Sequence, residues 1–538
     1  MKILKYILPL LFVGFLSQSC KKSYLDKDPL GQQTDQNFYN DPANAILAVN
    51  SIYDAVSWEE GNPATFSNHT YEWMFGDILS DNSEKGSTPS DFLDLADLKS
   101  WTAKSSANVV THATWANMYV AIFRANTTLL NLPNATFTDA ALKKRLKGEA
   151  FFLRAYCYLN IADKYGAVPL FTKPVQFSEW GKIKRSPLGE VYKQIMTDCD
   201  SAANALPPRS NYVAADLGRA TKGAALAYKA RAMIYQIGTD NANNITWQQV
   251  YDVCQQIIQS GEYSLVANYA TIFEQEGENN SESIFEIQYG SDNQTWGPIK
   301  TGTVSSVFQG NRTTYGWGFN DPTVEFMNSF ESTDPRAACT AYKAGDNVYG
   351  VLQSMKPSEA PTGYLNRKAA LDPVIIAGLT DIKDSPQNKR MFRYADIILI
   401  DAEAAAHIGK ESEALTMLNS IRARARNCSK PKGSTAGADD YQPTTGVNLP
   451  DISATGQALL DAIYNERRHE LGMEALRYFD LVRTGQYLSM LQAKYPDNYA
   501  ACLSHCIPVG GTVVNPIPTV PIPLSEVTAW GLEQNPGY

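Results

Sequence analysis

Histidine is scarce in this chain, with five residues among 538. The sequence contains no G-x-S-x-G nucleophile elbow, no Walker-type phosphate loop and no H-E-x-x-H zinc motif. The single His-Glu pair, His469 and Glu470, lacks the second histidine that a zinc protease needs. These absences argue against serine hydrolases, nucleotide hydrolases and zinc proteases, and they leave few groups for acid–base catalysis.

The chain also has few positive charges relative to negative ones, and few long apolar runs. The 47 Lys and Arg against 56 Asp and Glu give a formal net charge of -9. An acidic chain repels phosphate backbones, so we expect no nucleic-acid partner. Beyond the first twenty residues no segment is apolar enough to cross a bilayer. The 44% hydrophobic content is nevertheless typical of a globular protein with a sizeable core.

The first twenty residues have the pattern of an export signal. Lys2 and Lys5 precede an apolar run over 7–16, which is too short to span a membrane. The run ends just before Cys20, which follows the small residue Ser19 and resembles the lipid-attachment cysteine of a bacterial lipoprotein. The usual leucine three places before the cysteine is replaced by serine, so cleavage near Ser19 without lipidation is the alternative. We predict a signal peptide over 1–19 and a lipid anchor on Cys20.

Seven further cysteines remain, an odd number that requires at least one free thiol in an exported protein. Three of them lie in helical patterns and are predicted to be small core residues: Cys157, Cys199 and Cys254. Cys502 and Cys506 lie close enough in sequence to pair, and His505 lies between them. Their spacing is not that of a standard zinc site, so we expect neither a metal nor a cofactor.

Helix pairs dominate the rest of the chain. Apolar residues recur at helical spacing over 108–132, 139–165, 188–206, 218–238, 247–260, 394–407 and 456–483, with a break near Gly472. In 394–407 the aligned residues are small, whereas the following helix aligns larger ones, which lets two helices pack closely. This is the pattern of tetratricopeptide-like units, each of which leaves apolar surface for a neighbour to cover. We predict a mostly α fold of about four such pairs.

Long irregular stretches interrupt the helices. They cover 77–101, 262–385 and 429–449, and the second holds short strand-like runs such as 284–287. Long loops on a rigid helical scaffold are a common way to build a binding site.

Several segments resemble the SusD/RagB family of nutrient-binding lipoproteins. They are SYLDKDP at 23–29, GEAFFLRAY at 148–156 with YGAVPL at 165–170, RATKGAA at 219–225, YAD at 394–396, ERRHEL at 466–471 with RYFDLVR at 477–483, and PIP at 521–523 with QNPGY at 534–538. They span nearly the whole chain in the family's order. Arg154, Glu466 and Arg477 lie in otherwise apolar helices, so we predict that they form scaffold ion pairs.

The resemblance implies a single domain over 20–538, with an N-terminal part over about 20–300 and a C-terminal part over about 301–538. It also implies a non-catalytic lipoprotein on the outer face of the outer membrane. Such a protein captures oligosaccharides and delivers them to a SusC-like TonB-dependent transporter. Some members bind peptides instead, so a peptide ligand is the alternative. The sequence does not name the sugar.

Two other classes stay open at this stage. A glycoside hydrolase needs two carboxylates on either side of a sugar. Asp91, Asp94 and Asp97 share a helical spacing, but a solvated acidic face explains them better. A structural protein built from the same helix pairs would bind no glycan.

The candidate ligand site combines rings and polar groups from the irregular stretches. Rings alternate with glycine at Tyr315, Trp317 and Phe319, and an extended chain would place all three on one face. Flat rings suit the C–H faces of sugars, although an aromatic strand buried in the core has the same pattern. The remaining candidates in these stretches are Trp296, Trp101, Asp81 and Asn82.

Overall fold

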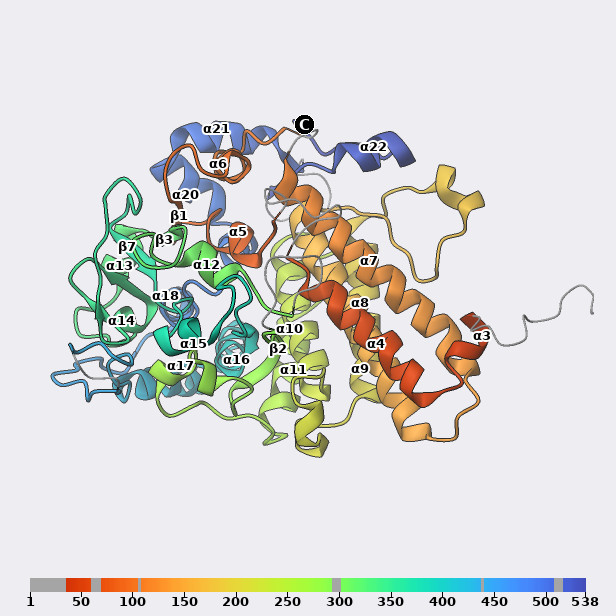
Figure 1. Ribbon diagram of the computed structural model, residues 1–538, viewed down its shortest axis with the longest axis horizontal. Helices are drawn as coiled ribbons and strands as arrows, with labels where there is room; N and C mark the ends of the chain where they lie inside the picture. The colour runs from red at the N-terminus through yellow and green to blue at the C-terminus, as the bar shows by residue number, and fades with distance from the viewer. Residues whose placement is uncertain (1–34, 60–68, 105–107, 293–300, 437–439, 508–515) are drawn as a thin grey trace, which may run out of the picture.

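The computed structural model describes residues 35–59, 69–104, 108–292, 301–436, 440–507 and 516–538. Helices form one side of the molecule and its centre, and short strands and loops gather on the other side (Figure 1). Cys20 and Trp296 lie outside the described residues.

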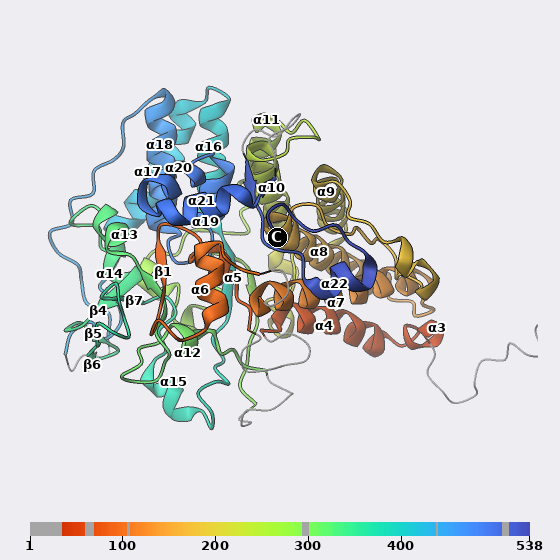
Figure 2. The same ribbon diagram turned by 90° about the horizontal axis from the view of Figure 1, so that it is seen from above.

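The helical part is a continuous array in which each helix packs against the next one along the chain (Figures 1 and 2). In order, the helices are α4 (Pro42–Ser57), α7 (Val109–Asn131), α8 (Ala140–Tyr165), α9 (Leu188–Ala205), α10 (Lys222–Gly238), α11 (Trp247–Ile258), α16 (Tyr394–His407), α17 (Glu411–Arg426) and α18 (Gly456–Glu470). The predicted mostly α fold and its helix pairs are confirmed. Assignment of the pairs to tetratricopeptide-like units, and of 20–538 to one domain, stays a prediction.

N-cap residues lie at or near the helix starts that the apolar periodicity predicts. Asp139 accepts a hydrogen bond from the Leu142 N–H at 2.9 Å at the start of α8. Thr221 caps α10, and Thr246 opens α11 with a capping box. Each cap satisfies N–H groups that the first helical turn leaves unpaired, typically worth about 1 kcal/mol.

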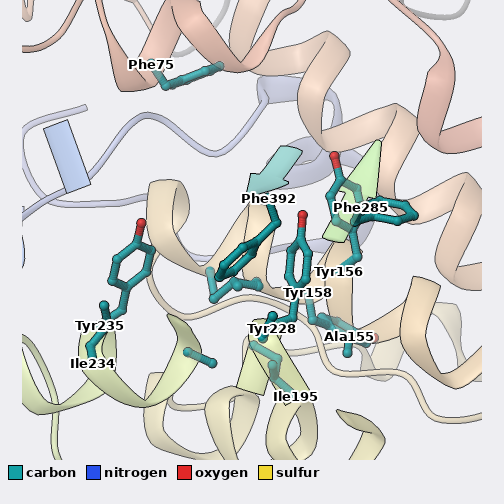
Figure 3. Close-up of a cluster of buried hydrophobic side chains, with 14 of the residues drawn as sticks. Phe75, Ala155, Tyr156, Tyr158, Ile195, Tyr228, Ile234, Tyr235, Phe285 and Phe392 are labelled. Carbon is teal, nitrogen blue, oxygen red and sulfur yellow. The ribbon is translucent and has the colours of Figure 1, made fainter. Parts of the chain in front are cut away.

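The core between α8, α10 and the strands is aromatic. Figure 3 shows the rings of Tyr156, Tyr228, Phe285 and Phe392 gathered there. Tyr228 lies 5.6 Å from Tyr156 and 5.5 Å from Phe392, centroid to centroid. The strands that carry Phe285 and Phe392 therefore seal the array on the side of the irregular part.

The irregular part is built from two-stranded antiparallel sheets and short helices. The paired strands are β1 (Ser83–Gly86) with β3 (Phe319–Pro322), β2 (Ser283–Ile287) with β8 (Lys389–Arg393), β4 (Ala341–Lys343) with β7 (Tyr364–Asn366), β5 (Asn347–Val348) with β6 (Val351–Leu352), and β9 (Cys506–Ile507) with β10 (Ile517–Pro518). The helices outside the array are α3 (Asp35–Phe38), α5 (Glu72–Gly76), α6 (Leu93–Ser100), α12 (Ser305–Gln309), α13 (Val324–Ser329), α14 (Arg336–Thr340), α15 (Pro373–Gly378), α19 (Arg477–Arg483), α20 (Tyr487–Lys494), α21 (Pro496–Ser504) and α22 (Leu524–Trp530).

The description of 77–101 as an irregular loop is wrong. This stretch contains β1 and α6, and most of residues 77–83 are fully buried. Ser83 of β1 pairs with Pro322 of β3, so the strand exists because of a partner more than two hundred residues away. Local sequence patterns do not carry such information.

The predicted scaffold ion pairs are confirmed. Arg154 of α8 binds Asp198 of α9 through two hydrogen bonds of 2.7 and 2.8 Å. Glu466 binds Arg422 at 3.0 Å and Arg336 at 2.6 Å. The last contact joins the array to α14 of the irregular part.

A larger buried network centres on Glu470, the last residue of α18. Its carboxylate binds Arg336, Arg393 and Arg424, which come from α14, the end of β8 and α17. Burial acts to raise its pKa, but the surrounding guanidinium groups bring it down to about 2. Glu470 is therefore ionised at neutral pH and holds the two parts of the molecule together.

In the described part of the chain, no helix is both long and apolar enough to cross a membrane.

Candidate ligand-binding surface

The structure buries most of the sequence-predicted site residues. Trp101 is 1% exposed, and its indole N–H donates to the Tyr487 hydroxyl at 3.1 Å. Its ring packs edge-on against the same tyrosine at the end of α6. Trp101 is thus buried against α20, and its ring is covered by the protein's own side chains.

Asp81 and Asn82 are also interior residues. Arg477 donates two hydrogen bonds to the Asp81 carboxylate, at 2.8 and 3.0 Å. Arg468 donates to the Asn82 side-chain oxygen at 2.7 Å and lies 3.1 Å from Asp81. Burial acts to raise the pKa of Asp81, but the two arginines lower it to about 2. The hydrogen bonds of both side chains are thus made within the scaffold, which argues against their assignment to a ligand.

The extended row of three rings does not form. Residues 311–316 make a turn, in which the N–H groups of Tyr315 and Gly316 both donate to the Asn311 carbonyl. Gly316 lies against the backbone of Gly310, where a Cβ would come within 2.2 Å of a carbonyl carbon. The glycine in the alternation therefore serves a close backbone approach and does not open a ligand face.

The three rings consequently have different surroundings. Phe319 begins β3 and is 4% exposed. Tyr315 is half-buried, and its hydroxyl accepts a hydrogen bond from the Leu371 N–H at 2.9 Å. Trp317 is half-buried, and its backbone N–H donates to the Val307 carbonyl at 2.8 Å. Of the three, Trp317 offers the most suitable ring for a ligand.

Trp317 belongs to an aromatic cluster centred on Phe308 of α12. The two rings meet edge to face, with centroids 4.6 Å apart. Phe92, also half-buried, lies 6.1 Å from Phe308 and 6.1 Å from Phe319. The buried rings thus form a base from which Trp317 and Phe92 reach the surface. Aromatic packing of this kind fixes ring orientation.

An ion pair lies between these two surface rings. Arg312 donates to the Asp91 carboxylate, to the Ser87 hydroxyl at 2.7 Å and to the Trp317 carbonyl at 3.3 Å. Burial acts to raise the pKa of Asp91, but hydrogen bonds from Ser87, Thr88 and Arg312 bring it below its usual value. The pair is about one third exposed on each side, so it presents both donors and acceptors to solvent. We call Asp91, Phe92, Arg312 and Trp317 the Trp317 surface.

Sequence reasoning missed Phe92 and Arg312 and interpreted Asp91 as part of an acidic face. Phe92 has a left-handed backbone, with φ of 48°, where the chain enters α6. Nothing in the local sequence connects it to 312–317. The contact depends on the pairing of β1 with β3.

Side chains from distant segments hold the loops beside this surface. The Glu59 carboxylate accepts hydrogen bonds from the Val304 N–H, at 2.8 Å, and from the Thr303 hydroxyl. Asp384 accepts from the N–H groups of Asp292 and Gly302, both at 3.0 Å. These carboxylates fix the backbone on either side of 293–300.

Two hollows compete with the Trp317 surface as sites. A half-open cavity of about 170 Å³ lies where the α8–α10 core meets the irregular part. Tyr156 and Tyr228, which line it, are among the rings labelled in Figure 3. The charged walls of the cavity are largely paired, as in Lys368 with Glu474 at 2.7 Å. Small-molecule pockets usually measure about 300–1,000 Å³, so this cavity is too small for an oligosaccharide.

The second hollow, of about 380 Å³, lies between α4 and the residues after β2. Two tyrosines line it, but the Tyr289 hydroxyl donates to the Ser57 carbonyl and the Tyr53 hydroxyl accepts from the Ala220 N–H, both at 2.9 Å. These hydroxyls tie the hollow's walls together. The Trp317 surface is therefore the better candidate, because its polar groups also face solvent.

The molecule is thus a helical scaffold that carries long loops, with rings and an ion pair at their surface. Comparison with known proteins gives the family. The SusD family model matches residues 281–538, and a second model, described as starch-binding associating with outer membrane, matches residues 23–235. The chain belongs to the SusD-like family.

Relatives and solved structures agree with this assignment. A SusD-like protein of Formosa agariphila is 25% identical, covering 90% of this chain and 91% of its own. A SusD-like protein of Bacteroides ovatus is 22% identical, covering 90% of this chain and 83% of its own.

Two solved structures are similar over almost their whole length. A laminarin binding SusD-like protein has a TM-score of 0.72 and 26% identity, covering 92% of this chain and 99% of its own. Surface glycan-binding protein A from Bacteroides thetaiotaomicron, in complex with laminarihexaose, has a TM-score of 0.73 and 22% identity with the same coverage. The SusD-like fold is thus confirmed, and surface glycan binding is the class of function that the relatives support.

Proposed function

We propose that this protein is a non-catalytic, lipid-anchored glycan-binding protein. It captures oligosaccharides outside the outer membrane and delivers them to a SusC-like TonB-dependent transporter. The observation that carries the binding role is the Trp317 surface, where a half-buried indole lies beside an exposed Arg–Asp pair. Membership of the SusD-like family supports the other parts of the proposal, namely the lipid anchor, the absence of catalysis and the delivery to a transporter.

The chemistry of this surface suits a sugar. An indole face covers the apolar C–H groups of a pyranose ring, while a guanidinium donates to hydroxyl oxygens and a carboxylate accepts from hydroxyl groups. Affinity is expected to be modest, because each hydroxyl gives up bound water before it binds.

A glycan array followed by calorimetric titration tests the binding role. The first ligand to titrate is laminarin, because two similar solved structures are named for laminarin or laminarihexaose. Trp317→Ala is expected to weaken binding at least about tenfold, which equals about 1.4 kcal/mol, with little change in melting temperature. The matched control is Trp180→Ala, since Trp180 is 46% exposed on the surface elsewhere.

Three outcomes contradict the proposal. Unchanged affinity in Trp317→Ala would mean that the ligand site lies elsewhere, and the hollow beside Tyr289 would be the next candidate. Binding of peptides, with no binding of any glycan on the glycan array, would replace the sugar ligand by the peptide alternative. Release of shortened glycan products by the pure protein makes it a hydrolase.

The anchor and the transporter have their own tests. Cys20→Ala is expected to release the protein from membranes and to remove acyl labelling. Unchanged fractionation and labelling would contradict the anchor.

Gentle detergent extraction of native membranes is expected to co-purify a barrel transporter, because specific interfaces usually bury more than about 1,000 Å². Purification without any barrel protein contradicts the delivery role.

A further inference from the structure

Two cysteines that are far apart in sequence meet in the interior. The sulfur atoms of Cys339 and Cys428 lie 3.5 Å apart, and the two side chains are 4% and 2% exposed. They share a small apolar cluster with Tyr269, Ala270 and Ile272. A disulfide requires a sulfur–sulfur separation of about 2.03–2.05 Å, so bonding would bring the two sulfur atoms closer together.

We propose that Cys339 and Cys428 form a structural disulfide in the mature, exported protein. The bond would join α14 of the irregular part to the end of α17 in the array. Exported proteins mature in compartments where disulfides form and persist. The N-terminal pattern of Lys2, Lys5 and the apolar run over 7–16 predicts export to such a compartment, and the proposal rests on that part of the proposed function.

The other described cysteines have different surroundings. Cys157, Cys199 and Cys254 are fully buried within helices of the array. The Cys506 thiol contacts the Cys502 carbonyl, at 3.3 Å, and the Cys502 thiol, but both contacts lie within one turn of chain. Cys339 with Cys428 is the pair that would link two different parts of the molecule.

The disulfide would form by thiol–disulfide exchange with an oxidising protein, which accepts the two electrons. A thiolate of one cysteine attacks the disulfide of an oxidising exchange protein and forms a mixed disulfide. The second thiolate then displaces the exchange protein. The two cysteines lose two protons and two electrons, and the oxidant's disulfide becomes two thiols.

The environment of the two cysteines favours a disulfide that forms before folding is complete and that persists in the folded protein. The hydrogen bond to Cys428 and burial both raise the pKa of the Cys339 thiol above its usual range. A buried thiol with a raised pKa is a poor nucleophile, so exchange would occur before this cluster closes. Burial would then protect the finished bond from external thiols.

The position of the pair reinforces the ion network at the junction. Arg336 lies one helical turn before Cys339, and Arg424 lies one turn before Cys428. Both arginines bind Glu470. The disulfide and the network therefore restrain the same elements. The bond would also close a loop of almost ninety residues, and long closed loops lower the entropy of the unfolded chain most.

The direct test is peptide mapping of the protein purified from native membranes. The protein is denatured in the presence of N-ethylmaleimide, so that buried free thiols are blocked, and is then digested without reductant. A cross-linked peptide pair containing Cys339 and Cys428, which separates after reduction, supports the proposal. N-ethylmaleimide on both cysteines in the unreduced sample overturns it.

Thermal unfolding gives an independent readout. Cys339→Ser, Cys428→Ser and the double variant are expected to lower the melting temperature by a similar amount, because each removes the same bond. Reductant during unfolding should lower the wild-type melting temperature toward theirs and leave the variants unchanged. Cys254→Ser is the matched control: it removes a buried thiol outside the pair, and its unfolding should stay sensitive to reductant. Additive losses in the double variant, or variants that respond to reductant as the wild type does, overturn the proposal.

Discussion

The helical array and the irregular part of this protein are held together in different ways. The array depends mainly on many small apolar contacts between neighbouring helices, as in α10, where Ala224, Ala227 and Ala230 are all fully buried. A few buried ion pairs, such as Asp396 with Arg231, add to them. The irregular part depends on single polar side chains that reach across the fold, such as Glu59 and Asp384. Distributed contacts tolerate the loss of one member better than a unique polar contact does.

This difference in how the two parts are stabilised indicates which part can carry a binding site. An array stabilised by its own packing can support loops that contribute little stability. The Trp317 surface lies on such loops, whereas the Glu470 network lies where the two parts meet. The following predictions test this division, from the largest expected effect to the smallest.

Removing charge at the junction should have the largest effect. Glu470→Gln leaves Arg393 and Arg424 buried with less compensation, and breaking such buried pairs typically costs about 3–5 kcal/mol. Chemical unfolding should therefore show a strongly lowered midpoint. The control is Glu413→Gln, since Glu413 forms an exposed pair with Lys410. Equal midpoints for the two variants would contradict the central role of the network.

Trp101→Ala should unfold the protein more readily without removing the ligand site. Truncating a fully buried tryptophan typically costs about 3–5 kcal/mol. The Trp101 variant is thus expected to have a lowered melting temperature and near-normal glycan affinity when folded, the reverse of Trp317→Ala. Loss of affinity with unchanged melting would instead restore Trp101 to the ligand site.

Acid should destabilise the array through Asp396. This buried carboxylate binds Arg231 and Arg467, both at 2.6 Å. Burial acts to raise its pKa, but the two arginines bring it to about 2, below the ordinary 3.8. A lowered pKa in the folded state contributes stability above about pH 4, and this is lost as the pH falls toward 2.

The expected loss from this group is about 2 kcal/mol. Thermal unfolding at a series of pH values measures it. Asp396→Asn should be less stable at neutral pH and should show a shallower decline between pH 4 and 2. An identical decline in both proteins would assign the acid sensitivity to other groups.

The surface pair should matter least for stability. Arg312→Ala removes an exposed ion pair with Asp91, and such pairs contribute about 0–1 kcal/mol. Glycan affinity should fall about fivefold, the effect of losing one hydrogen bond of about 1 kcal/mol. Titration with the glycan identified on the glycan array measures this, and Lys410→Ala, at an exposed pair in the helical array, is the control. Unchanged affinity would exclude Arg312 from the site.

Much of the array could be predicted because its determinants are local. Helix α16 covers the predicted 394–407, and α9 ends one residue before the predicted end at 206. A helix depends on residues three and four positions apart and on caps within the same segment. The ion pairs of Arg154, Glu466 and Arg477 were predictable for a related reason: a charge in an apolar helix requires a partner, whatever that partner is.

The ligand surface depended on tertiary structure. The sequence by itself determined the helices and the family, and it carries the pattern from which export and an anchor at Cys20 are predicted. It did not reveal that Trp101, Asp81 and Asn82 are interior, that 311–316 turns, or that Phe92 and Arg312 lie beside Trp317. Periodicity records which face of an element is apolar, but two segments more than two hundred residues apart meet only when strands such as β1 and β3 pair in the folded chain.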